Sequence, residues 1–277
     1  MTADHLTSAA QPASTRLDGA LLGAGTFTAI RVPPPRRVDA AAGEVAMLTA
    51  PIWGLIVGLC AGAAGCAVTL VAGWTGNASP LTALLAGVAA VAGGAWITRG
   101  LHLDGLADVA DALASARRGA AGLEVMRDPR IGALGAVSLG LAILAQAVAL
   151  GALFASGRGL VAAVAVAVMA RAPLALLVRR GTPADDSGLG RTVVGSTRPL
   201  SATLSGALAT MVAVALLVNV GGIGLSAAAA AAAAAWLCAL GVRRAALRRF
   251  DALTGDALGA AIEFGCTAAL LVLAVAG

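Results

Sequence analysis

Three aspartates stand at helical spacing in the polar segment that joins two apolar stretches. Asp104, Asp108 and Asp111 occupy positions i, i+4 and i+7, so a helix would place them on one face within two turns. Their carboxylates repel one another unless a cation lies between them, and Mg²⁺ prefers such oxygen ligands. Gly105 leaves room for a phosphate or a metal-bound water to approach the helix. The spacing predicts a Mg²⁺ site in which Asp104 and Asp108 are also catalytic; the alternative is an ordinary solvated loop.

A mixed cluster of charges follows the aspartates. Arg127, Asp128 and Arg130 lie within four residues, and Pro129 and Gly132 favour a turn there. Planar guanidinium groups bind phosphate oxygens in pairs, so the two arginines are candidates to hold a pyrophosphate. The carboxylate of Asp128 would then complete the coordination of the metal.

Two other polar features have both a functional and a structural interpretation. His102, two residues before the first aspartate, could act as a general base or could anchor the start of a helix at the lipid headgroups. Arg191 and Arg198 lie among glycines, serines and threonines, a composition typical of phosphate recognition and also of any flexible loop.

The last apolar segment begins with a second acidic pair. Thr254 and Gly255 resemble a helix N-cap and its entry turn, and the helix dipole favours the negative charge of Asp256. Glu263 lies seven residues further, on the same helical face and inside an apolar run. Acids within membranes are usually functional, and Arg171 in another apolar run is the predicted counter-ion of Glu263. The alternative is a purely structural ion pair.

The composition identifies the class of protein that must position these side chains. Of the 277 residues, 59% are hydrophobic and only 12% are charged, which excludes a soluble domain. All 19 basic residues are arginines, but Phe and Trp total eight and Tyr is absent, so base stacking on nucleic acid is not indicated. Anionic lipids or phosphorylated substrates are the expected partners.

Uncharged runs long enough to cross a bilayer predict an all-α, polytopic membrane helix bundle. Residues 1–18 form a polar tail, and residues 19–277 form one membrane-embedded domain that begins with a short interfacial or re-entrant segment over 19–30. The prolines of RVPPPRR end that segment. The expected spans are 47–72, 80–97, 132–154, 159–178, 203–220, 225–240 and 257–276.

The arginines define the orientation of this bundle. The N-terminal segment and the loops at 98–131, 179–202 and 241–256 hold four, five, four and four arginines, whereas the intervening loops hold one in total. Under the positive-inside rule, the N-terminus and the three rich loops lie in the cytoplasm. We therefore expect a multi-pass protein of the cytoplasmic (inner) membrane with a cytoplasmic active face.

The chain closely resembles the cobalamin synthase family, the adenosylcobinamide-GDP ribazoletransferases, at HLDGLADVADAL and MRDPRIGALGA. The resemblance extends in order through FTAIRVPPP, PIWGLIVG and TGDALGAAIE, from about residue 20 to 265. The family more often has Lys and Ser where this chain has Arg127 and Pro129, so the positive charge is kept here and the serine hydroxyl is absent.

The resemblance implies a Mg²⁺-dependent membrane phosphotransferase. Such an enzyme joins α-ribazole, or its 5′-phosphate, to adenosylcobinamide-GDP: the ribose 3′-hydroxyl attacks the phosphorus that carries cobinamide, and GMP leaves. The family's motif residues correspond to the following positions of this chain: Asp104, Asp108, Asp111, Asp128, Asp256 and Glu263 among the acids, and Arg31, Arg127 and Arg130 among the bases.

Two other functions compete with this one. A CDP-alcohol phosphatidyltransferase also uses spaced aspartates in a membrane, but its motif continues from Asp-Gly to Ala-Arg, and here Ala107 precedes Asp108. An ion-coupled transporter needs polar groups from several helices near the bilayer centre and an internal repeat. Neither feature is visible in the sequence. The sequence does not define the number of subunits, and a homo-oligomer is one alternative.

Overall fold

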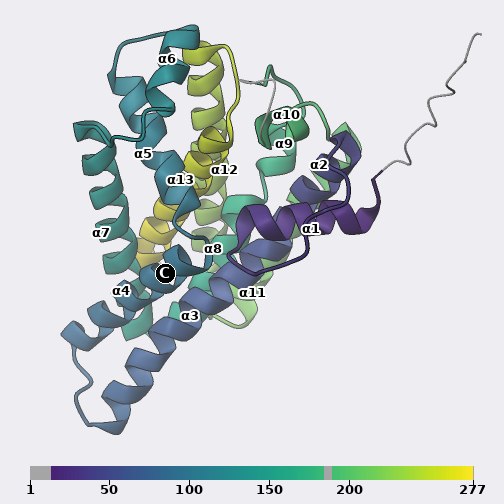
Figure 1. The fold of residues 1–277 in the computed structure, drawn as a ribbon. Helices are drawn as coiled ribbons and strands as arrows, with labels where there is room; N and C mark the ends of the chain where they lie inside the picture. Colours follow the sequence, from purple (N-terminus) through teal and green to yellow (C-terminus); the bar gives the residue numbers. More distant parts are fainter. Residues whose placement is uncertain (1–13, 184–188, 277) are drawn as a thin grey trace, which may run out of the picture.

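A computed structural model describes residues 14–183 and 189–276 of the chain (Figure 1). Apart from one isolated β-bridge between Pro183 and Leu253, the regular structure of this part is helical, which confirms the predicted all-α class. The helices are α1 (Arg16–Phe27), α2 (Ala40–Leu48), α3 (Ala50–Trp74), α4 (Pro80–Ile97), α5 (Leu101–Ala114), α6 (Gly119–Met126), α7 (Ala133–Ala155), α8 (Gly159–Arg171), α9 (Leu174–Leu177), α10 (Leu189–Val193), α11 (Pro199–Asn219), α12 (Leu225–Phe250) and α13 (Gly255–Ala276).

Seven segments of the described residues are long and apolar enough to cross a membrane: α3, α4, α7, α8 with α9, α11, α12 and α13. They coincide with the seven predicted spans, and the chain is a multi-pass membrane protein. The predicted segment over 19–30 is α1, which is joined to a second short helix, α2, by the proline-rich connection. Of the predicted polar tail, residues 1–13 lie outside the described part, as do residues 184–188 of the loop at 179–202.

The predicted loop at 241–256 is largely wrong, because α12 continues through Phe250. The residues after the apolar stretch are mostly Ala, Leu and Arg, which favour helix. Arg243 holds this extension against α9 by donating from Nε to the Leu177 carbonyl at 2.8 Å. Asp251 ends α12 in the left-handed region, with φ of 57°. The arginine-rich end of α12 is therefore a helical arm beyond the apolar stretch.

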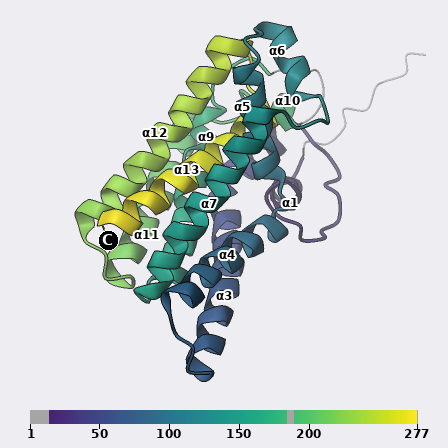
Figure 2. The ribbon, with the colours of Figure 1, turned by 90° about the vertical axis from the view of Figure 1, so that its left-hand side faces the viewer.

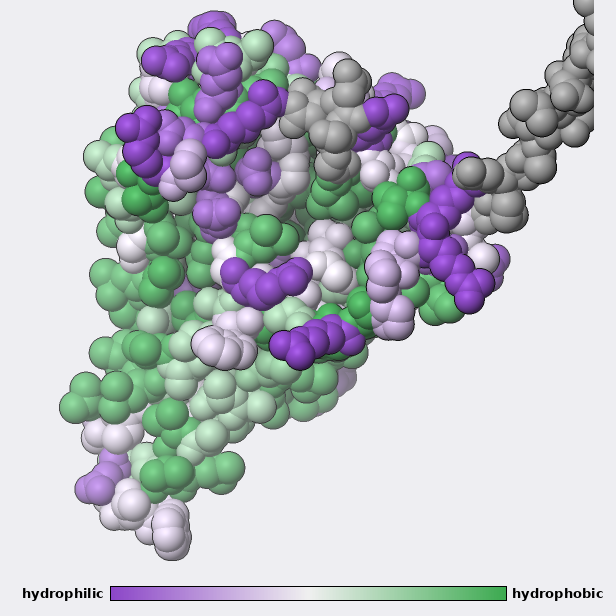
Figure 3. Space-filling model, in the orientation of Figure 1, coloured by the Kyte–Doolittle hydropathy of each residue, from purple (hydrophilic) through white to green (hydrophobic). Residues whose placement is uncertain are grey.

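The molecule has one polar end and one long apolar body (Figure 3). Figure 1 places α5 and α6 beside the end of α12 at the top, whereas the turn between α3 and α4 lies at the opposite end. Most of the exposed large apolar side chains belong to the spanning helices, as expected of a surface in contact with lipid. The residues predicted to do chemistry therefore lie mainly at the polar end.

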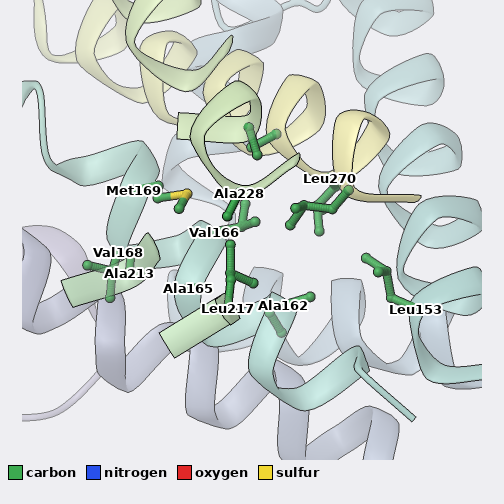
Figure 4. Close-up of a cluster of buried hydrophobic side chains, with 14 of the residues drawn as sticks. Leu153, Ala162, Ala165, Val166, Val168, Met169, Ala213, Leu217, Ala228 and Leu270 are labelled. Atoms are coloured by element: carbon green, nitrogen blue, oxygen red, sulfur yellow. The ribbon is translucent and has the colours of Figure 1, made fainter. Parts of the chain in front are cut away.

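Helix α8 lies at the centre of the bundle and packs against α3 through glycines. Gly54 and Gly58 face the backbone of α8 so closely that an added Cβ would lie 2.5 Å from it, and a Cβ on Gly62 would lie 2.4 Å from the Leu160 side chain. Small residues at such spacing let membrane helices approach each other. Figure 4 shows the adjoining cluster, in which Val166 and Met169 of α8 lie among side chains of other helices.

The run of alanines in α12, residues 227–235, also serves packing. Ala228, Ala231 and Ala235 are fully buried. The run belongs to the same apolar cluster as α8, and α12 lies along α13 (Figure 2).

Candidate active site

Helix α5 carries the three aspartates and leaves the membrane-spanning α4 through a sharp turn. Arg99 and Gly100 both have positive φ, 57° and 68°, and Gly100 is the N-cap of α5. The turn redirects the chain so that α5 packs against α13 and α7 instead of extending α4. The predicted loop at 98–131 consequently contains two helices, α5 and α6.

Gly105 is the point at which α5 and α13 come closest. A Cβ on Gly105 would lie 2.7 Å from the backbone oxygen of Asp256 and 2.8 Å from its Cα. The room that the sequence suggested for a phosphate or a metal-bound water is therefore filled by the protein backbone. Thr254 is the N-cap of α13, as predicted, and its Oγ1 accepts a hydrogen bond from the Ala257 amide at 3.0 Å. The close contact between Gly105 and the backbone of Asp256 brings Asp256 to the helix that carries the three aspartates.

Asp108 experiences the resulting concentration of negative charge. Its partly buried carboxyl has a pKa raised to about 7, first by burial and then by the charges of Asp104, Asp256 and Asp111. An acid surrounded by other acids is held partly protonated near neutral pH unless a cation compensates the charge. The repulsion predicted from spacing is present, and Asp256 adds to it.

Asp111 has a structural role that its spacing did not predict. Its two carboxylate oxygens accept hydrogen bonds from the backbone amides of Gly132 at 2.7 Å and Gly135 at 2.8 Å. These amides belong to the first turn of α7, which otherwise has no side-chain cap. Asp111 thus caps a membrane-spanning helix from a distance, and its role as a metal ligand stays a prediction.

The residues of the predicted cluster at 127–130 border two different cavities. Asp128 pairs with Arg130 through contacts of 2.9 Å from Nε and 2.7 Å from Nη2, which lower the pKa of Asp128 to about 2. Both side chains border an open cleft shared with Asp108 and Asp111. Arg127 instead borders a more enclosed cavity.

That enclosed cavity has a volume of about 290 Å³ and lies between α1, α2, α5, α6 and α13. Its wall is mostly apolar and includes Phe27, Met47, Leu123, Met126, Leu258 and Ile262. Its polar groups include His102, Arg127 and Asp256. Asp104, Asp108 and Asp256, together called the carboxylate group below, therefore lie between an apolar cavity and a charged open cleft.

His102 is buried, and one nitrogen of its ring is engaged. Nδ1 lies 3.3 Å from Nη2 of Arg171, which is itself buried. A guanidinium can only donate, so Nδ1 must accept and the proton of the neutral ring lies on Nε2. Burial and the charge of Arg171 both lower the pKa of His102 well below its ordinary value. This geometry makes His102 a hydrogen-bond donor and leaves no lone pair for the predicted general base.

Glu263 has a partner that the sequence analysis missed. Its Oε2 accepts from Nε2 of Gln146 at 2.9 Å, and Gln146 also donates to Thr267 at 3.0 Å. Arg171, the predicted counter-ion, borders the same cavity of about 70 Å³, but no ion pair joins it to Glu263 among the described residues. A polar Gln within an apolar span was the available signal. Glu263 lies in this intramembrane network, about two turns from Asp256.

The remaining predicted arginines lie in three places. Arg198 pairs with Glu44 of α2, with Nε 3.7 Å from Oε2, and its backbone amide donates to Oε1 at 3.2 Å. Arg191 lies on α10 beside Gly190, which borders the enclosed cavity. Arg31 is exposed in the connection between α1 and α2. The structure thus brings Arg191 near the cavity and ties Arg198 to a different contact.

The carboxylates fit a Mg²⁺ ion by chemistry, because they offer oxygen donors and a concentration of negative charge around Asp108. No three acidic, His or Cys side chains of the described residues are grouped closely enough to ligate one ion by themselves. Mg²⁺ usually keeps several waters and binds one or two carboxylates together with substrate phosphates. Asp104, Asp108 and Asp256 are the groups that would hold it.

Comparison with known proteins identifies the family. Residues 19–274 match the model of a family described as cobalamin-5-phosphate synthase. The chain belongs to the cobalamin-5-phosphate synthase family. This confirms the resemblance seen in the sequence.

Curated members of the cobalamin-5-phosphate synthase family align with nearly the whole chain. A relative from Frankia casuarinae is 37% identical over 259 residues, covering 90% of this chain and 92% of its own. Relatives from Klebsiella pneumoniae and Escherichia coli are 36% and 33% identical, each covering 88% of this chain and 94% of its own. All three are named adenosylcobinamide-GDP ribazoletransferase. No solved structure matches this family member.

Proposed function

We propose that this chain is an adenosylcobinamide-GDP ribazoletransferase. It would join α-ribazole, or its 5′-phosphate, to adenosylcobinamide-GDP with release of GMP. The observation that carries the proposal is the contact of Asp256 with Gly105, which joins the two acidic motifs of the family at one site. Membership of the family supplies the substrates, and the site supplies groups suited to phosphoryl transfer.

The chemistry balances as a substitution at phosphorus. The ribose 3′-hydroxyl gives its proton to the solvent and its oxygen forms a bond to the phosphorus that carries cobinamide. The bond from that phosphorus to the bridging oxygen breaks, and GMP leaves with that oxygen. A Mg²⁺ ion would neutralise the pyrophosphate. The chain's own contribution is to hold the cation through Asp104, Asp108 and Asp256 and to place Arg127 at the cavity beside them.

The charged cleft suits the pyrophosphate substrate. Arg130 is strongly exposed there, although Asp128 already binds its guanidinium, so a phosphate would have to compete for it or use its remaining N–H donors. Arg191 is proposed to contact substrate from α10, and Arg31 from the proline-rich connection. For Arg198 and Glu263, their contacts with Glu44 and Gln146 favour positioning roles over direct substrate contact.

We also propose that the site faces the cytoplasm from the inner membrane. The basis is the positive-inside rule, because the arginine-rich connections and the arm of α12 lie at the same end of the molecule as α5 (Figure 1). A nucleotide substrate made in the cytoplasm would then reach the site directly.

The test is turnover by the purified full chain in lipid nanodiscs. Adenosylcobinamide-GDP and α-ribazole with Mg²⁺ should give equal amounts of GMP and the joined corrinoid, and chelation should stop the reaction. In a parallel assay, a CDP-linked lipid is offered as the donor and a free alcohol as the acceptor, and no CMP should be released. Release of CMP without GMP would replace the proposal with the phosphatidyltransferase alternative.

A further inference from the structure

The enclosed cavity of about 290 Å³ offers a ligand mostly apolar walls and few polar groups. Small-ligand pockets usually measure roughly 300 to 1,000 Å³, so this one suits a single compact group and not a corrin ring. Side chains from α1, α2, α6 and α13 form the apolar part, including Phe27, Met47, Met126 and Leu258. The volume and lining favour a compact, mainly hydrophobic group.

His102 provides a polar group of fixed direction in that cavity. Because Nδ1 accepts from Arg171 at 3.3 Å, the proton lies on Nε2, the only hydrogen-bonding atom that the ring can offer a ligand. No described residue accepts a hydrogen bond from Nε2. Arg171 is held in turn by donating from Nη1 to the Ala167 carbonyl at 3.0 Å. The ring centroids of Phe27 and His102 lie 6.1 Å apart, and both residues line the cavity.

A benzimidazole nucleoside has the complementary pattern. Its bicyclic base is apolar apart from one unsubstituted ring nitrogen, which accepts a hydrogen bond and cannot donate one. A guanine base also offers acceptors to His102, but its N–H donors would have to bind Asp256, the acidic side chain that borders the cavity. The ribose would extend toward Asp256, which borders the cavity and belongs to the carboxylate group.

We propose that this cavity binds the base of the acceptor nucleoside, with the Nε2–H of His102 donating to its free ring nitrogen and Arg171 fixing the tautomer that can donate. This inference rests on the proposed function, since it assigns one of the two substrates to a place. It makes His102 a specificity-determining residue and Arg171 a positioning residue. The pyrophosphate substrate is left to the open cleft on the other side of the aspartates.

The experiment compares two acceptors on two proteins. The acceptors are α-ribazole and its indole counterpart, in which the free ring nitrogen is replaced by C–H. The proteins are the wild type and His102→Leu, with adenosylcobinamide-GDP saturating and GMP release as the readout. The wild type should show a KM about tenfold higher for the indole nucleoside, the effect of one lost hydrogen bond. His102→Leu should show nearly equal KM values for both, and His102→Gln, which keeps an N–H, should restore part of the difference.

A second variant tests the location without depending on His102. Met126→Trp would fill the cavity, and Met211→Trp on the exposed face of α11 is its matched control. Met126→Trp should raise the KM for α-ribazole at least tenfold and change the KM for adenosylcobinamide-GDP less than twofold, while the control changes neither.

Three results would overturn the assignment. One is equal use of both nucleosides by the wild type. Another is continued tenfold discrimination by His102→Leu, and the third is a Met126→Trp effect confined to adenosylcobinamide-GDP. In each case GMP release by the wild type would still support the proposed function. If the wild type released no GMP with any acceptor, the proposed function and this inference would both fail.

Discussion

Replacing Gly105 with alanine should separate the two halves of the carboxylate group. The new Cβ would lie 2.7 Å from the Asp256 backbone oxygen, whereas ordinary contact begins at 3.4 Å, so α5 and α13 must move apart by about 0.7 Å. The clash is with backbone, so no side chain can rotate to relieve it. Overpacking of this kind costs about 1–3 kcal/mol, and a misplacement approaching 1 Å in an active site can reduce turnover about 100-fold.

The assay pairs GMP release with thermal unfolding of the purified protein in nanodiscs. Gly140→Ala on α7 is the matched control, because an added Cβ there meets nothing within 4 Å. We expect Gly105→Ala to lower kcat by one to two orders of magnitude and to lower the melting temperature, while the control keeps full activity and gains slight stability from alanine's helix propensity. Wild-type kcat and melting temperature in Gly105→Ala would refute the reasoning that this contact assembles the site.

Three further predictions follow from other contacts. Asp111→Asn leaves one oxygen for the two amides of α7, so the free energy of unfolding should fall by about 1–2 kcal/mol; an unchanged melting temperature would contradict the capping role. Because the pKa of Asp108 is raised to about 7, protons compete with Mg²⁺ for its carboxylate below neutral pH. Calorimetry should therefore show that the affinity for Mg²⁺ rises with pH up to about 7 and then levels, and that binding near pH 6 releases protons. An affinity independent of pH between 5 and 7 would contradict a role of Asp108 in binding the cation. Reporter fusions at residues 115 and 250 should behave as cytoplasmic and those at 76 and 223 as external, and an external signal at 115 would put the site on the wrong face.

The fold could be predicted from sequence because the bilayer imposes a simple rule on length and polarity. An uncharged run of about 20 residues can only be a spanning helix, and each predicted span is present. The end of α12 could not be predicted in that way. Arg243 and its neighbours are too polar for a span but favour helix, and the contact of Arg243 with the Leu177 carbonyl decides the outcome.

The sequence could predict which residues form the site, but it could not predict all of the contacts that those residues make. Spacing placed Asp104 and Asp108 on one face, and their mutual repulsion is present. Spacing within one helix says nothing about which other helix lies opposite, so it missed that Asp111 caps α7 and that Gln146 binds Glu263. Such pairings depend on contacts over 21 to 117 residues of chain separation, which local periodicity does not encode.

The central claim is that the carboxylate group carries the reaction. It is tested most directly by comparing the turnover of Asp108→Asn with that of Asp251→Asn. Both substitutions remove one carboxylate charge. Asp108 lies in the carboxylate group, whereas Asp251 is exposed at the end of α12 in a left-handed conformation that Asn also adopts. With adenosylcobinamide-GDP, α-ribazole and Mg²⁺, the wild type and Asp251→Asn should release GMP at similar rates, and Asp108→Asn should release at least 100-fold less while remaining folded. Full GMP release by folded Asp108→Asn would contradict the claim that this group of carboxylates carries the reaction.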